Sequence, residues 1–222
     1  MYAKCLKVVV GLALLAMTGY ATTPRTQKAA FAGSPYAEAA KPEPADTANA
    51  APGGAVSAKT AFWQMYKQAY SWAKDAVPLK LESKELPGVK NEAGKAAMWS
   101  ATFGSSTKHQ AVVITYAVAA HAPDIYKGNN VGSPIPWRGP TRDVMPFQTS
   151  EFVIDSDAAY KTAEADANAW LKKHPDKQAT FLLGHNTARF SAPVWYIVWG
   201  DSKSGYAAFV NATSGSLVKG KK

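Results

Sequence analysis

The sequence predicts an α+β fold of two repeated units, each one helix followed by antiparallel strands, with the helices packed on the sheet. Two long segments carry apolar residues at helical spacing, and several shorter segments alternate apolar and polar residues as strands do. These elements follow one another twice in the same order. The chain of 222 residues is 47% hydrophobic, which is enough to bury a core.

The first 21 residues predict a removable export signal. Lys4 and Lys7 precede an apolar run, and the small residues Gly19 and Ala21 suit a signal peptidase. The run is shorter than the roughly 20 residues of a spanning helix, so we favour cleavage over the alternative, a retained membrane anchor. Cys5, the one cysteine, lies before the run, so the mature chain would have no disulfide. We expect an exported protein, periplasmic or extracellular, with no stable transmembrane segment after cleavage.

Residues 22–57 predict a disordered linker. They are rich in Ala, Pro, Thr, Gly and Ser, and they hold few large apolar side chains that could form a core. We expect this segment to tether the folded part.

Residues 58–120 predict the first unit. Apolar residues from Phe62 to Val77 follow three-and-four spacing, which is typical of an amphipathic helix, and Pro78 would close it. The strands expected after this helix are 79–86, 97–103 and 112–118.

Residues 121–154 predict a connecting loop. Prolines and glycines recur through this stretch, so no regular element is expected in it. A loop of this length inside a compact domain is usually functional or a linker.

Residues 155–222 predict the second unit. Asp155, Ser156 and Asp157 supply oxygens that can start a helix, which would run to about Lys173 and end at His174. The strands expected after it are 181–183, 194–199, 206–210 and 216–218.

The repeat is carried by matching residues. The segment from Trp99 to Gly104 recurs 96 residues later from Trp195 to Gly200, with an aromatic residue at the same two places. Segment 111–114 recurs at the same offset as 207–210, after a polar turn that we expect to be of equal length. The alternative is chance similarity between amphipathic segments, and it leaves the α+β class unchanged.

The closing stretch from Val210 to Val218 resembles the PepSY family, whose last hairpin commonly ends in Val-Asp-Ala-x-Thr-Gly-x-Val. Asn211 stands where Asp is usual, and Ser214 where Thr is usual. The resemblance covers roughly the last 65 residues and reaches the first unit only through the repeat. It implies an exported bacterial protein related to modules that restrain peptidases, and it carries no catalytic residues.

No pattern in the sequence predicts a catalytic residue, a metal site or a cofactor. The four histidines lack the spacing that would bring them to one metal, and no zinc or phosphate-loop pattern is present. Ser105 and Lys108 fit Ser-x-x-Lys, but they lie in an expected turn between strands. The formal net charge of +9 suits contact with anionic surfaces or simply solubility, and no dense basic run predicts nucleic-acid binding.

Three residues of the connecting loop are the predicted binding site: Trp137, Arg138 and Arg142. Tryptophan and arginine are the residue types most enriched where proteins bind partners. The alternative is that Trp137 folds back on the sheet as a lid.

From the whole sequence we expect a non-catalytic binding module of the bacterial envelope, with a protein or an envelope polymer as partner and a peptidase-inhibitory or regulatory role implied by the PepSY resemblance. The alternatives are an envelope hydrolase with its site in the 119–150 loop, and a purely structural surface protein.

Overall fold

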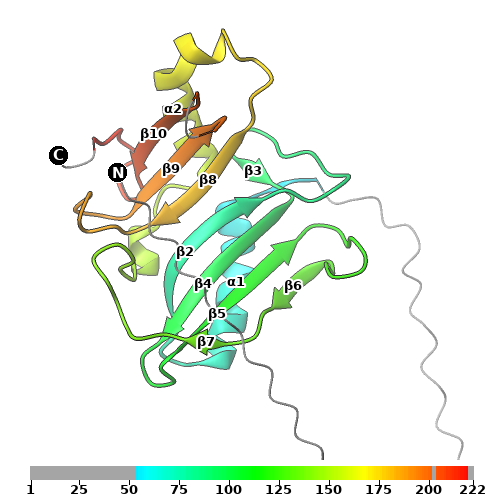
Figure 1. Cartoon of the computed structure of the whole chain (residues 1–222), viewed down its shortest axis with the longest axis vertical. Helices are drawn as coiled ribbons and strands as arrows, with labels where there is room; N and C mark the ends of the chain where they lie inside the picture. Colours follow the sequence, from blue (N-terminus) through cyan, green and yellow to red (C-terminus); the bar gives the residue numbers. More distant parts are fainter. Residues whose placement is uncertain (1–53, 202–203, 220–222) are drawn as a thin grey trace, which may run out of the picture. The chain divides into compact units, whose positions relative to one another are not determined.

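The computed structural model describes residues 54–201 and 204–219 (Figure 1). The predicted signal and most of the predicted linker lie outside the described residues. The fold begins at Val56, inside the range predicted as linker, because β1 (Val56–Ser57) pairs with β3 (Lys95–Ala96) in a small two-stranded sheet.

The main sheet has eight strands, and every pair in it is antiparallel. Its order is β10-β9-β8-β2-β4-β5-β6, and β7 also pairs with β5. The strands are β2 (Val77–Lys84), β4 (Met98–Ser105), β5 (Gln110–Ala117), β6 (Gly128–Val131), β7 (Ile135–Pro136), β8 (Ala179–Gly184), β9 (Val194–Trp199) and β10 (Tyr206–Asn211).

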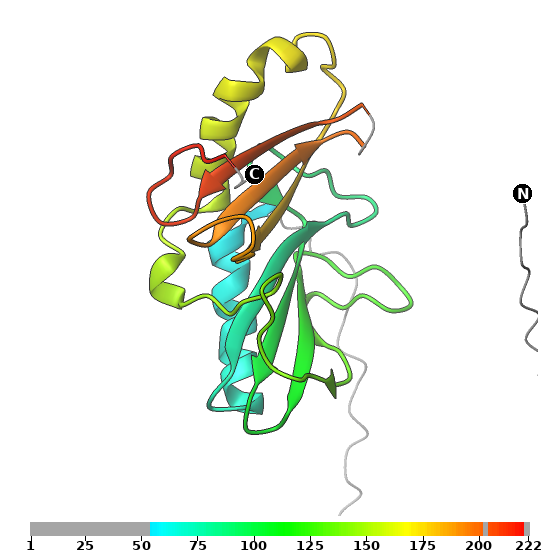
Figure 2. The same ribbon diagram turned by 60° about the vertical axis from the view of Figure 1, so that its left-hand side comes forward.

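Two helices pack on one face of this sheet (Figures 1 and 2). Helix α1 (Ala58–Trp72) contacts β4 and β5, and α2 (Ser156–Leu171) contacts β9 and β10. The predicted α+β class, with a large antiparallel sheet and helices packed on it, is confirmed. The predicted first helix is too long, because Val77 and Pro78 belong to β2, where a register shift after Pro78 accommodates its missing N–H.

The core lies between the helices and the sheet. Large side chains alternate along β4 and β9, so that Trp99, Phe103, Trp195 and Trp199 are all buried on the inner face. Helix α1 meets them with the large side chains of Phe62 and Met65, and Phe62 lies 6.0 Å from Phe103 between ring centroids. The other buried helix residues include six alanines: Ala58, Ala61, Ala69, Ala159, Ala163 and Ala167. Small helix residues let the helix backbone approach the indole rings closely, which fills the space at the density of a protein interior.

The amino-terminal ends of the two helices are joined. The backbone N–H of Ala58 donates to Ser156 Oγ at 2.8 Å, and that of Lys59 donates to Asp155 Oδ1 at 2.9 Å. Asp155 also accepts from the N–H of Ser156 at 2.7 Å, so one carboxylate caps both helices. Ser57, the residue before α1, makes no cap bond with its own side chain.

The strands after each helix are arranged in mirrored order. Strands β2 and β8 are neighbours in the middle, and β4, β5 and β9, β10 lie outward from them. Trp99 Nε1 donates to the carbonyl of Val56 at 2.9 Å, and Trp195 Nε1 donates to that of Ile154 at 3.0 Å. Each carbonyl lies two residues before the first residue of a helix.

The expected equality of the two polar turns is wrong. Phe103 pairs with Val112, whereas Trp199 pairs with Tyr206, so the β9–β10 connection is two residues shorter than the β4–β5 connection. Segment 207–210 therefore lies two residues out of the predicted match with 111–114. A shift of two keeps every side chain on its face, which is why the alternation alone could not reveal it.

The stretch 121–154 is more regular than predicted. It contains β6, β7 and a 3-10 helix (Thr149–Glu151), and β6 and β7 both pair with β5. Prolines are compatible with these strands because an edge strand pairs on one side only, so a proline that lacks an N–H leaves no ladder hydrogen bond unmade on its outer side. The stretch is also bonded to the sheet beyond β7, through Trp137 N to His109 O, Met145 N to His185 O and Phe147 N to Pro78 O. We call residues 137–147 the strap.

Candidate functional site

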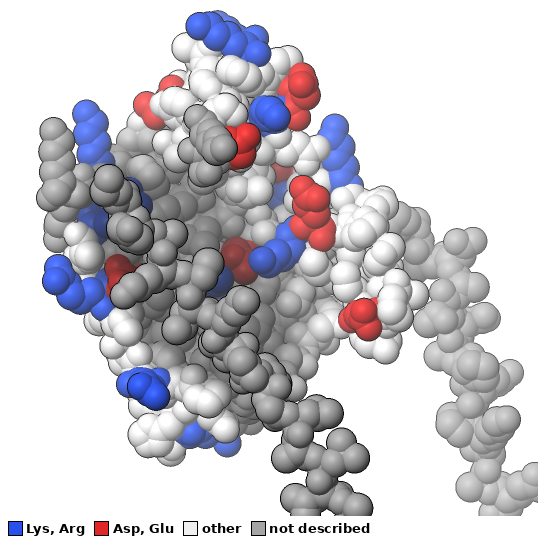
Figure 3. Space-filling model, viewed as in Figure 1, with Lys and Arg blue, Asp and Glu red and all other residues white. Residues whose placement is uncertain are grey.

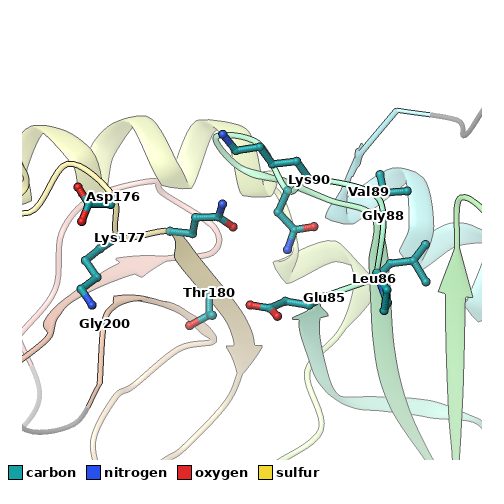
Figure 4. Close-up of a pocket in the computed structure, with 12 residues that line it drawn as sticks. Glu85, Leu86, Gly88, Val89, Lys90, Asp176, Lys177, Thr180 and Gly200 are labelled. Atoms are coloured by element: carbon teal, nitrogen blue, oxygen red, sulfur yellow. The ribbon is translucent and has the colours of Figure 1, made fainter.

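One hollow in the described part of the chain lies beside the junction of β2 and β8, and we call it the seam groove. It has a volume of about 770 Å³, and its walls are the loop 85–91 after β2 and the segment 176–180 that leads into β8 (Figure 4). A second hollow of about 370 Å³ continues it, since both are lined by Lys90, Asn91, Lys177 and Gln178.

Local contacts hold both walls of the seam groove. The side chain of Asn91 accepts from the N–H of Ala97 at 2.8 Å and so fixes the loop after β2. On the other wall, the ring of His174 stacks on that of Trp170 with centroids 4.1 Å apart, where α2 ends and the chain turns back toward β8. These contacts fix the loop after β2 and the end of α2 just before the other wall.

The seam groove carries charges of both signs. Its lining includes the carboxylates of Glu85 and Asp176 and the ammonium groups of Lys90 and Lys177, all on exposed residues. Figure 4 shows the carboxylate of Glu85 directed toward Thr180 across the groove. Within residues 54–201 and 204–219, the salt bridges involve none of these four groups.

Sequence reasoning did not single out any residue of the seam groove. Its two walls are about 90 residues apart in the chain and are brought together by the pairing of β2 with β8. The signals available were the Pro87-Gly88 turn and the break at His174-Pro175, which mark both walls as loops but not as neighbours.

The predicted binding residues lie elsewhere, on the strap. The ring of Trp137 lies over Gly104 on the sheet face opposite the helices, where a Cβ at Gly104 would come within 2.9 Å of the ring. Trp137 is half-buried, which matches the lid alternative, whereas Arg138 and Arg142 are exposed. In the view of Figure 1, Figure 3 shows lysine, arginine and acidic side chains interspersed over the molecule. The described hollows are not lined by any of these three residues.

The Ser-x-x-Lys segment is part of a hydrogen-bonded turn. Ser105 is fully buried, its hydroxyl donates to Asp75 Oδ1 at 2.7 Å, and it accepts from the N–H of Lys108 at 3.1 Å. The N–H of Thr107 donates to the other carboxylate oxygen of Asp75 at 2.8 Å. The bonds from Ser105 and Thr107 lower the pKa of Asp75 to about 2.

Among the residues that the structure describes, no cluster of three or more His, Cys, Asp or Glu side chains is arranged to hold a metal ion. Over the same residues, no helix combines the length and the apolar character that crossing a bilayer requires.

Comparisons with known proteins give one similar structure. No family model matches the sequence, and no curated protein matches it. Among solved structures, a chain described as a putative lipoprotein from Clostridium difficile 630 is similar, with 10% sequence identity and a TM-score of 0.46. The similarity covers 72% of this chain and 91% of that chain.

Proposed function

We propose that this protein is an exported, non-catalytic binding module that takes a polar segment of a protein or of an envelope polymer into the seam groove. The observation that carries the proposal is the groove itself, with two carboxylates and two ammonium groups on its walls and no ion pair among them in the described residues. A ligand with charges or hydrogen-bonding groups in the complementary pattern can bind all four without first breaking an internal ion pair.

The side-chain bonds of the groove favour binding over chemistry. Acid–base catalysis needs a donor and an acceptor that each lie within hydrogen-bond reach of the reacting group. Two lining side chains of the groove instead bond to main-chain carbonyls of the described residues, Asn91 to Lys84 O and Thr180 to Val198 O.

We further propose that the two helix-and-strand units are copies of one PepSY-like unit. The supporting observations are the mirrored strand order and the matching bonds of Trp99 and Trp195 to carbonyls just before each helix. By this resemblance, a peptidase is a reasonable first partner to test.

The proposal that the protein is exported rests on the amino-terminal pattern, and mass spectrometry of the exported protein should find a chain beginning near Thr22. An intact Met1 there would contradict it.

The binding proposal is tested with two charge-reversal variants of equal charge. Lys90→Glu with Lys177→Glu changes the groove, whereas Lys161→Glu with Lys172→Glu makes the same change on exposed residues of α2 and its end. Capture from an envelope extract should identify a partner that the control variant retains and that the groove variant binds at least tenfold more weakly. Equal capture by both variants would refute the groove as the binding site.

A further inference from the structure

The sheet face opposite the helices carries another hollow, of about 250 Å³, which we call the strap trough. It lies between the strap and the start of the β8–β9 connection. Its apolar lining is Leu79, Leu182, Tyr196 and Val144, its polar lining is Lys80, Asp143, His185 and Asn186, and Gly184 completes it.

The walls of the strap trough are bonded to each other. The N–H of Met145 donates to the carbonyl of His185 at 2.9 Å, and that of Thr187 donates to the carbonyl of Arg142 at 2.8 Å. Asn186 Nδ2 adds a bond to Asp143 Oδ1 at 3.3 Å. These bonds hold the trough open in the absence of a ligand, so little ordering would accompany binding.

The floor of the trough is rigid and apolar. Leu182 and Tyr196 are direct partners across β8 and β9. The ring of Tyr196 packs edge-on against Phe190 and Phe209, with centroids 5.6 and 5.3 Å apart. Burial raises the pKa of Tyr196, against the opposing effect of Arg189. An aromatic ring held on two sides offers a firm contact surface to an apolar group.

The lysine of the trough already has an ion-pair partner, and its aspartate already accepts a hydrogen bond. Lys80 Nζ lies 3.2 Å from Glu82 Oε2, and Glu82 also pairs with Lys84 at 2.8 Å. The carboxylate of Asp143 accepts from Asn186 and keeps further acceptor positions. An ionic ligand would gain little from a lysine that is already paired, whereas a neutral amide could donate to Asp143 and accept from Lys80.

We propose that the strap trough binds the apolar side chain of one residue within an extended, uncharged stretch of a partner protein. The volume of about 250 Å³ is below the range of about 300–1,000 Å³ that is typical of drug-sized ligands and above the roughly 150 Å³ of a cavity that holds benzene, so the trough has room for one leucine-sized side chain with adjoining backbone. The ligand's own peptide groups would bond to Asp143 and Lys80 at the rim. This site is separate from the seam groove and stands or falls independently of it.

The experiment is a titration of the purified full chain with two capped peptides, followed by backbone amide signals in NMR. The probes are acetyl-Gly-Leu-Gly-amide and acetyl-Gly-Ala-Gly-amide. The leucine peptide should give saturable shifts centred on Val144, Leu182 and His185, and the alanine peptide should bind at least tenfold more weakly, since each methylene lost from an apolar pocket weakens binding. Shifts centred elsewhere, no saturable shifts, or equal binding of both peptides would overturn the proposal.

Two variants block the trough in different ways. At Gly184 a Cβ would meet Leu182 Cδ2 at 3.8 Å and Leu79 O at 3.9 Å, which are ordinary contacts, so Gly184→Leu would place its side chain in the trough. This variant should lose binding of the leucine peptide. Val144→Ser changes an exposed wall residue with little risk to folding and should weaken binding several-fold. Unchanged affinity in either folded variant would contradict the proposal.

The paired lysines give a matched control. Lys80 and Lys84 both pair with Glu82, but only Lys80 lines the trough among the residues described. Lys80→Gln should lower the affinity for the leucine peptide a few-fold, and Lys84→Gln should leave that affinity unchanged. Equal effects of the two changes would show that Lys80 does not contact the ligand.

Discussion

Replacing Ser156 with alanine should destabilise the whole fold, because its hydroxyl is the joint between the two helices. Ser156 is fully buried, and its Oγ accepts from the N–H of Ala58 and donates to the carbonyl of Gly94. The joint therefore ties the start of α1, the start of α2 and the loop before β3 to one oxygen atom.

The magnitude follows from the groups that the change leaves unpaired. The N–H of Ala58 and the carbonyl of Gly94 are both on buried residues, and Ser156→Ala removes the partner of each. An unsatisfied buried polar group costs about 1–3 kcal/mol, so the two together predict a loss of about 2–6 kcal/mol in the free energy of unfolding. Asp155 still caps both helices in the variant, which keeps the loss from being larger.

Urea denaturation of the wild-type chain and two variants measures this loss. Ser57→Ala is the control, because the Ser57 hydroxyl bonds only to exposed Thr60 Oγ1 in the described structure, and its removal should change stability by less than about 0.5 kcal/mol. A loss below about 1 kcal/mol for Ser156→Ala, or equal losses for both variants, would refute the reasoning that the buried joint holds the helices together.

The remaining predictions concern pH, the paired tryptophans and the strap. The lowered pKa of Asp75 means that its carboxylate stabilises the fold above the unfolded pKa near 4, and that this contribution is lost as the pH falls from about 4 toward 2. In Asp75→Asn the free energy of unfolding should therefore fall less steeply between about pH 4 and pH 2 than in the wild-type chain. An unchanged pH dependence would contradict the role of the bond between Asp75 and Ser105. Trp99→Phe and Trp195→Phe each remove one indole N–H bond, worth about 1–2 kcal/mol, and each leaves a cavity in the core, so both should lower stability by a similar amount above that figure. Denaturation can compare the two variants directly, and a loss confined to one site would weigh against equivalent units. Trp137→Ala should lower the melting temperature, since the half-buried ring covers Gly104, and a variant with unchanged melting but weaker partner capture would favour the binding alternative instead.

The sequence predicts most of this fold because its signals are local. The alternation from Val194 to Trp199 and the three-and-four spacing after Phe62 report the environment of each side chain directly, and both elements are present in the structure. The capping role of Asp155 was also predictable from its place before the second helix. That the same carboxylate caps the first helix was not, because nothing local to α1 indicates a partner nearly 100 residues away.

The seam groove and the strap trough could not be predicted from the sequence, because their walls come from segments that are distant in the chain. Trp137 and its neighbouring arginines drew attention because their residue types suit binding, but composition does not say which face a loop covers. Pro136 suggested an irregular loop, whereas β7 forms on the edge of β5, where a proline needs no partner on its outer side. Hollows arise where segments meet, and those meetings are set by tertiary pairing that a single sequence does not display.

Both proposed sites depend on the pairing of β2 with β8. The seam groove takes one wall from the loop after β2 and the other from the segment before β8, and the strap trough uses Leu79 and Lys80 of β2 beside Leu182 and Gly184 of β8. This pairing comprises only three register pairs, Lys80 with Gly184, Leu81 with Leu183 and Glu82 with Leu182. Segments that are distant in the sequence thus form each hollow only where β2 and β8 meet. A ligand that contacts groups on both sides of this pairing would stabilise it by mass action.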